Sequence, residues 1–166
     1  MIILIIFILT VFLGGLVLPA LLGPLEFLII PVFLLAIIIF DKDFKAGLIK
    51  GIFFGFLVEI FFGFRLGSIT SSLLLVAMLY YWLERSTNIG SLFKKPIDKL
   101  SILGQSSFLA MFTYLYSFIF ILNQTSYDIV LAWQRFNLLL NVFIILNTFL
   151  FSAFFSYVLA KTRQRL

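Results

Sequence analysis

The sequence predicts an all-α integral membrane protein, a bundle of about six transmembrane helices with both termini in the cytoplasm. Hydrophobic residues make up 63% of the 166-residue chain and charged residues 11%, and the mean hydropathy is +1.22. These values lie far outside the range of soluble globular domains. Several apolar runs reach or approach the ~20 residues that a helix needs to cross ~30 Å of hydrocarbon. No run of alternating apolar and polar residues occurs, which favours helices over a membrane barrel.

The apolar runs divide the chain into six predicted spans, which together form one transmembrane domain (1–166). The first run carries no basic residues before it and is too long for the core of a signal peptide, so we expect it to be retained. Gly23-Pro24 ends this run, because proline lacks a backbone donor and restricts the residue before it. The second run is short for a span and ends at Asp41-Lys42-Asp43. We expect the spans at about 2–22, 25–40, 46–64, 68–83, 102–122 and 137–160.

Basic residues are distributed unevenly between the two sides of this topology. One side holds ten of the twelve, and only Arg65 and Arg135 lie on the other. Because lysine and arginine accumulate on the cytoplasmic side of membrane proteins, both termini are expected in the cytoplasm. The net charge of +5 is then explained by basic residues that fix the topology and contact anionic lipid headgroups, so no nucleic-acid partner is expected. The ten residues are Lys42, Lys45, Lys50, Arg85, Lys94, Lys95, Lys99, Lys161, Arg163 and Arg165.

Several chemistries are excluded by residues that the sequence lacks. The chain has no cysteine and no histidine, which removes disulfides, thiolate nucleophiles, imidazole bases and most zinc ligation. The predicted spans contain neither a carboxylate pair nor a phosphate-binding glycine loop followed by lysine. We therefore predict a non-enzymatic protein with no catalytic residues, no metal site and no cofactor.

A periodic stripe of glycines marks the third predicted span and its end. Five of the ten glycines lie here, and one acidic residue occupies the remaining position of the repeat. At 3.6 residues per turn, positions four apart lie nearly above one another, so another helix can approach closely along the stripe. We predict a helix-packing or partner-binding surface, with the third span as the central packing helix, and expect Gly55→Leu to disrupt assembly. The stripe consists of Gly47, Gly51, Gly55, Glu59, Gly63 and Gly67.

Glu59 is the one acidic residue that the predicted topology buries. A charge at mid-membrane depth costs roughly 2.5–3.5 kcal/mol, so Glu59 needs protonation, a partner or a wet cavity. Arg65 is the nearest basic residue, which makes a Glu59–Arg65 ion pair possible. Two interpretations remain open: a structural or partner contact that orders the outer end of this span, and substrate or proton chemistry.

Other polar residues in the spans are expected to form hydrogen bonds inside the bundle. The hydroxyls of Ser68, Thr70, Ser71 and Ser72 can bond to backbone carbonyls or to a neighbouring helix, so they do not require a ligand. Amides within membrane helices tend to hydrogen-bond across helices. We therefore expect one polar face of the last span to point inward, formed by Asn137, Asn141, Asn147, Ser152 and Ser156.

The segment from Phe44 to Gly67 resembles the rod shape-determining protein MreD family. Members of this family are small membrane proteins with a basic residue, a small-residue stripe, an acidic residue four positions after a glycine and a further glycine eight positions later. This chain has Lys45, Gly47, Gly51, Gly55, Glu59 and Gly67 at those positions, although family members more often carry aspartate where Glu59 stands. Pro24 and the short second run are also compatible with the family.

The resemblance implies a non-enzymatic scaffold of the bacterial cell-elongation machinery, involved in cell shape and peptidoglycan synthesis. It implies the lipid bilayer and an MreC-like membrane protein as partners. It also implies a fold similar to the membrane-embedded substrate-binding components of energy-coupling-factor vitamin transporters. Such a component is the alternative function: it would bind a small molecule in the bundle and dock an ATP-driven module through small-residue motifs.

Overall fold

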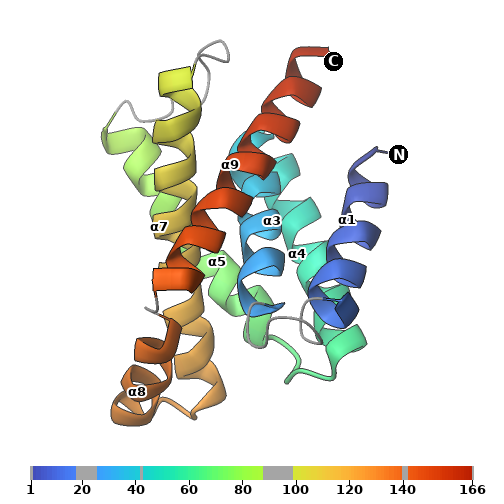
Figure 1. Ribbon diagram of the computed structural model, residues 1–166. Helices are drawn as coiled ribbons and strands as arrows, with labels where there is room; N and C mark the ends of the chain where they lie inside the picture. Colours follow the sequence, from blue (N-terminus) through green and yellow to red (C-terminus); the bar gives the residue numbers. More distant parts are fainter. Residues whose placement is uncertain (1, 18–25, 42, 88–98, 140–141, 166) are drawn as a thin grey trace.

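The computed structural model describes residues 2–17, 26–41, 43–87, 99–139 and 142–165. All regular secondary structure in these ranges is helical, which confirms the predicted all-α class (Figure 1). Seven α-helices are described, and a short π-helix, η1 (Leu13–Val17), continues the first of them. In chain order the α-helices are α1 (Ile2–Phe12), α3 (Glu26–Phe40), α4 (Phe44–Phe62), α5 (Ser68–Ser86), α7 (Lys99–Gln124), α8 (Ile129–Leu139) and α9 (Val142–Arg165).

Helix α3 lies at the centre of the bundle. Every residue from Ile29 to Phe40 is buried, and α3 contacts α1, η1, α4, α5, α7 and α9. The cause is in its sequence, which is apolar on all sides of the helix and therefore requires cover on all sides. Pro31 interrupts the backbone hydrogen bonding of α3, since proline has no N–H to donate.

The prediction that the third span is the central packing helix is wrong. That span corresponds to α4, which packs against α3 and α5 and leaves its opposite face exposed. The exposed face carries large apolar side chains, whereas the glycines lie on the packed face. The apolar sequence of α3 on all its sides thus marks the centre of the fold, whereas the glycine stripe of α4 does not. The exposed residues are Ile49, Phe53, Phe56, Ile60 and Phe61.

The long helices run roughly side by side, and the described α4–α5 turn lies at one end of the bundle. Figure 1 places the start of α1 and the end of α9 at the upper end, and the α4–α5 turn and α8 at the lower end. This arrangement agrees with the predicted placement of both termini on one side. Arg65 of the α4–α5 turn and Arg135 of α8 belong to the lower end, where few basic residues were expected.

The last predicted span differs from the structure at its beginning. The expected span 137–160 is divided between α8, which ends at Leu139, and α9, which begins at Val142. Asn137 therefore belongs to the short helix α8 and is exposed.

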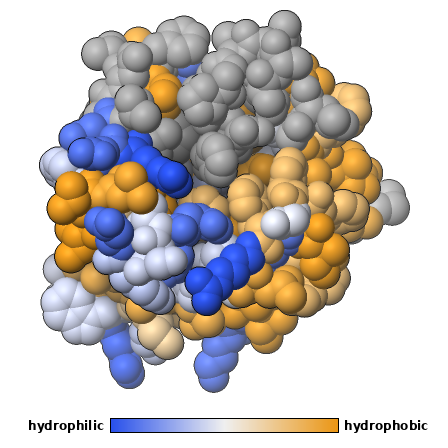
Figure 2. Space-filling view, turned by 90° about the horizontal axis from the view of Figure 1, so that it is seen from below, coloured by the Kyte–Doolittle hydropathy of each residue, from blue (hydrophilic) through white to orange (hydrophobic). Residues whose placement is uncertain are grey.

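Figure 2 views the molecule from its lower end, where α8 and the α4–α5 turn lie. It shows hydrophilic side chains gathered on part of this face, with hydrophobic ones beside them. Exposed Gln134 and Arg135 of α8 are among the polar residues at this end.

One segment of the described chain meets the length and composition needed to cross a membrane. It is Ile102–Gln124 within α7, with 23 residues. Three shorter apolar helices accompany it: Ile3–Phe12, Ile29–Phe40 and Ile144–Leu159. The end of the first predicted span, residues 18–22, lies outside the described residues.

Candidate functional site at the α4–α5 turn

Helix α4 ends in a glycine turn that is organised by the backbone of Glu59. The amide of Gly63 donates to the carbonyl of Glu59, and the amide of Phe64 donates to the same carbonyl at 3.0 Å. Gly63 has a φ of 65°, a left-handed conformation that glycine adopts without the steric cost of a Cβ atom. The chain therefore leaves α4 sharply at Gly63.

The side chain of Glu59 begins the next helix. It is 0% exposed, and its carboxyl group accepts hydrogen bonds from the start of α5. Its Oε2 accepts from the Gly67 amide at 2.8 Å. Its Oε1 accepts from the amides of Ile69 and Thr70 at 2.6 and 2.9 Å, and from the Thr70 hydroxyl at 3.2 Å. One residue thus terminates α4 with its carbonyl and caps α5 with its side chain.

This arrangement is electrostatically favourable. The first amides of a helix have no partner within the helix, and the aligned peptide dipoles place partial positive charge there. A carboxyl group at this position satisfies several amides at once, which a serine or threonine cap does not do. The buried acidic residue therefore has a partner, as the sequence required, and that partner is backbone.

The predicted ion pair between Glu59 and Arg65 is not formed. The four donors to the Glu59 carboxyl come from Gly67, Ile69 and Thr70, and the Arg65 side chain is exposed. The single salt bridge among the described residues joins Lys50 and Asp41 at the other end of α4. Backbone amides win because they are fixed by the helix, whereas an exposed arginine gains little from a pair in water and loses side-chain freedom.

The end of α7 holds the start of α5 from the other side. The Asn123 side-chain amide donates to the hydroxyls of Ser71 and Ser72 at 3.1 and 3.0 Å, and the Gln124 amide donates to the Ser68 hydroxyl at 3.2 Å. Ser72 also donates to the Ser68 carbonyl at 2.7 Å. The hydroxyls of α5 thus bond both to backbone and to a neighbouring helix, as expected, whereas the role of Asn123 and Gln124 was not foreseen.

The glycine stripe divides into two parts with different roles. A Cβ atom on Gly47 would lie 2.9 Å from the Ile38 carbonyl oxygen, and one on Gly51 would lie 2.7 Å from Ile38 Cγ1, so both glycines allow α4 to approach α3. Gly55 faces α5, where Leu73 Cδ1 would be 3.0 Å away. These three glycines therefore lie where α4 packs against neighbouring helices. Gly63 and Gly67 lie in the turn instead, with φ angles of 65° and 89°.

We expect Gly63→Ala and Gly67→Ala each to lower stability by about 1–2 kcal/mol. Nothing lies within 4 Å of a Cβ atom at either position, so the cost comes from the left-handed backbone alone. Gly63→Asn is the matched control, because asparagine tolerates this conformation better than alanine. Thermal unfolding in detergent, followed by circular dichroism, measures the difference. Equal melting temperatures for Gly63→Ala and the wild type would contradict the assigned backbone role.

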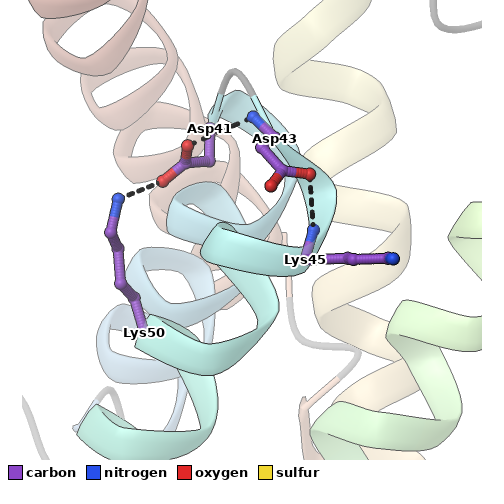
Figure 3. Close-up of polar contacts among 4 residues, drawn as sticks. All are labelled: Asp41, Asp43, Lys45 and Lys50. Atoms are coloured by element: carbon purple, nitrogen blue, oxygen red, sulfur yellow. Dashed lines mark hydrogen bonds and ion pairs between the residues drawn. The ribbon is translucent and has the colours of Figure 1, made fainter.

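A separate polar turn joins α3 to α4 at the opposite end of α4. The Asp43 side chain caps α4 by accepting from the Lys45 amide at 3.1 Å, and Asp41 pairs with Lys50. Figure 3 shows these four residues around the turn, with Lys45 pointing away from the pair. This turn ends α3 and starts α4 with local capping, so its charges are used for structure.

Most buried hydroxyls of the bundle are satisfied within their own helix. Six of them donate to the carbonyl four residues earlier at 2.6–2.8 Å: Thr10, Ser72, Ser106, Thr113, Ser117 and Thr148. Ser152 and Ser156 of α9 point inward as predicted and are 0% exposed, but neither hydroxyl has the expected hydrogen bond among the described residues. Asn147 is half-buried and lines a cavity of about 470 Å³ between α1, η1, α3 and α9. The prediction is wrong for the exposed Asn137, and Asn141 lies outside the described residues.

An apolar cavity lies next to the Glu59 cap. It has a volume of about 250 Å³ and is bounded by α3, α4, α5, α7 and the α4–α5 turn. Glu59 itself is not part of the wall, since its carboxyl group is bonded to α5. The lining residues are Ile30, Pro31, Val58, Phe62, Phe64, Ile69, Tyr116 and Phe120.

The chemistry available at this site is that of a rigid, capped helix junction. The carboxyl group of Glu59 is occupied by four donors, and the described ranges contain no group of three or more acidic residues that could hold a metal ion. No protein-family model matches the chain, and searches of curated proteins and of solved structures found no significant match.

Proposed function

We propose that the chain is a multi-span protein of the bacterial inner membrane that acts as a non-enzymatic scaffold. In this proposal it belongs to the cell-elongation machinery, where it binds an MreC-like membrane protein and supports cell shape and peptidoglycan synthesis. The observation that carries the proposal is the set of hydrogen bonds that the Glu59 carboxyl group accepts. The one fully buried acidic side chain of the described residues is bonded to the α5 amides, so it supports a helix junction and is not free for proton or substrate chemistry.

The outer surface supports a membrane environment. Large apolar side chains are exposed along α1, α4, α5 and α9, and soluble monomers rarely expose apolar surface on that scale. Trp82, near the end of α5, and Trp133, on α8, are 65% and 53% exposed at opposite ends of the bundle. Tryptophan favours the two membrane–water interfaces, so its placement fits a bundle that spans the bilayer.

The exposed face of α4 is the partner surface that we propose. Ile49, Phe53, Phe56 and Ile60 are exposed and are spaced by four, three and four residues. This spacing draws one seam along a helix, as in helix pairs that pack through knobs and holes. The inner face of α4 already packs through glycines, so the seam is left for lipid or for another helix.

Affinity purification from mild detergent, with mass spectrometry of the recovered proteins and small molecules, tests the scaffold. We expect recovery of cell-elongation membrane proteins, including an MreC-like one, and a loss of at least about half of that recovery in a Phe53→Ala, Phe56→Ala variant. A Leu150→Ala, Phe154→Ala variant is the matched control, since it removes equivalent exposed side chains from α9. Equal recovery by both variants would reject the α4 seam as the partner surface.

The alternative function, a substrate-binding component of an energy-coupling-factor type vitamin transporter, has one observation in its favour. The cavity next to Glu59 lies between α3, α4, α5 and α7 and has a volume of about 250 Å³, which is large enough for a small molecule. In the same purification this alternative predicts a pair of transporter ATPases and a stoichiometric small molecule. Recovery of those ATPases without elongation proteins would replace the scaffold proposal.

A further inference from the structure

The Tyr116 side chain is buried, and its hydroxyl forms no hydrogen bond to any other described residue. The side chain lies in the second half of α7 and is 2% exposed. Among the described residues its interactions are a stacked contact with the Phe120 ring, at 6.0 Å between centroids, and the electrostatic influence of Glu59. A buried hydroxyl that lacks a partner is energetically unfavourable, so native proteins rarely retain one without a reason.

Tyr116 also lines a cavity. In the described part of the chain, the fully enclosed side-chain oxygens without a partner belong to Ser152 and Ser156, so the Tyr116 oxygen is not sealed by protein atoms. The space that Tyr116 lines is the cavity of about 250 Å³ beside the Glu59 cap. The cavity therefore has an apolar wall and one hydroxyl group that is free to donate or accept a hydrogen bond.

The wall of the cavity limits what can occupy it. Its other lining groups are aliphatic and aromatic, including Val58, Ile69 and Phe120, and none of them is charged. The nearby carboxyl group of Glu59 is engaged by α5. A charged ligand would lose its hydration without gaining a counter-charge, so the occupant has to be neutral. An apolar cavity of about 150 Å³ holds benzene, so this larger cavity fits a molecule of about ten non-hydrogen atoms.

We propose that the cavity between α3, α4, α5 and α7 binds a small neutral amphiphile whose single polar group hydrogen-bonds to the Tyr116 hydroxyl. Such a molecule fills an apolar, aromatic-lined space and gives the buried hydroxyl the hydrogen-bond partner that the described residues do not supply. The tip of a lipid acyl chain fills the space equally well but leaves the hydroxyl unpaired. This site goes beyond the scaffold function and does not rest on it.

Two probes of matched shape test the proposal on the full-length protein in detergent. 2-Naphthol has one hydroxyl group and naphthalene has none, while both have about the size of the cavity. Binding is measured by equilibrium dialysis against protein-free micelles of the same detergent, which corrects for partition into the micelle. Tyr116→Phe removes only the hydroxyl group. Tyr114→Phe is the matched control, because Tyr114 also lies on α7 but its hydroxyl is 3.5 Å from Thr148 of α9.

We expect the wild type and Tyr114→Phe to bind 2-naphthol roughly three- to tenfold more tightly than Tyr116→Phe does, the contribution of one neutral hydrogen bond. Naphthalene should bind equally to all three. Equal affinity of wild type and Tyr116→Phe for 2-naphthol would overturn the proposal and leave the cavity as a space for lipid tails. If Tyr116→Phe does not fold, the binding of the two probes to the wild type alone tests the proposal. Tighter binding of 2-naphthol than of naphthalene, after correction for the micelles, supports the site, and equal binding overturns it.

Discussion

Replacing Glu59 with leucine is expected to lower the free energy of unfolding by about 3 kcal/mol or more. Leucine has a similar size but no acceptor, so the amides of Gly67, Ile69 and Thr70 lose their partner. Each buried donor left without a partner costs about 1–3 kcal/mol. Denaturant titration in mixed micelles, followed by far-UV circular dichroism, measures the change. An unchanged unfolding midpoint would show that the cap contributes nothing to stability.

Two further variants separate this cap from the ion pair that the sequence left open. Glu59→Gln keeps one oxygen for Ile69 and Thr70 but sets an NH₂ group against the Gly67 amide, so we expect a smaller loss of about 1–2 kcal/mol. Arg65→Gln should leave stability unchanged, because Arg65 is exposed and does not bond to Glu59. A loss in Arg65→Gln equal to that in Glu59→Gln would favour the ion pair over the cap.

Replacing Gly47 with alanine is expected to lower stability by about 2 kcal/mol or more, the second large effect. The added Cβ atom would lie 2.8 Å from Asp41 Cβ, 2.9 Å from the Ile38 carbonyl oxygen and 3.1 Å from the Ile37 carbonyl oxygen. Two of these neighbours are backbone atoms of the central helix, which cannot move aside as a flexible side chain does. Overpacking of this kind costs about 1–3 kcal/mol even where side chains can adjust. The same titration measures this loss.

Other glycines provide the controls for Gly47. At Gly55 the close neighbours are the side-chain atoms Leu73 Cδ1 and Ile69 Cγ2, at 3.0 and 3.3 Å, so Gly55→Ala should be milder. The expected disruption by Gly55→Leu therefore rests on side-chain crowding, and the place where two backbones meet is Gly47. Gly104→Ala meets nothing within 4 Å and should be neutral or stabilise by up to about 1 kcal/mol through helix propensity. Equal losses at Gly47 and Gly104 would contradict the close approach of α3 and α4.

The helices could be predicted from the sequence because their signals are local. Apolar runs bounded by Gly-Pro, by the Asp41-Lys42-Asp43 segment and by a glycine turn gave boundaries close to those of α3, α4 and α5. The division between α8 and α9 was missed, because the sequence there contains neither a proline nor a glycine. The central position was assigned to the wrong helix, because it depends on what surrounds a helix on all sides, whereas the glycine stripe marks only the packed face of α4.

The Glu59 site was predictable in part. A lone carboxyl group in an apolar run requires a partner, and the sequence identified that need correctly. Arg65 was the possible partner that the sequence offered, because an arginine is visible in a sequence as a counter-charge, whereas three backbone amides at a helix start are not. The useful signal was the short turn from Gly63 to Gly67 followed by the hydroxyl residues from Ser68, which marks a helix start within reach of Glu59. The contact of Asn123 with Ser71 and Ser72 links positions far apart in the chain and left no local pattern.

Labelling of single cysteines in intact cells tests the proposed membrane bundle most directly. The chain contains no cysteine, so Arg65→Cys, Gln134→Cys, Thr87→Cys and Lys161→Cys each introduce one at an exposed position. We predict that a membrane-impermeant maleimide labels positions 65 and 134 in intact cells, and positions 87 and 161 only after permeabilisation. Labelling of all four positions in soluble extracts, or of 65 and 87 from the same side, would contradict a membrane-spanning bundle with both termini in the cytoplasm.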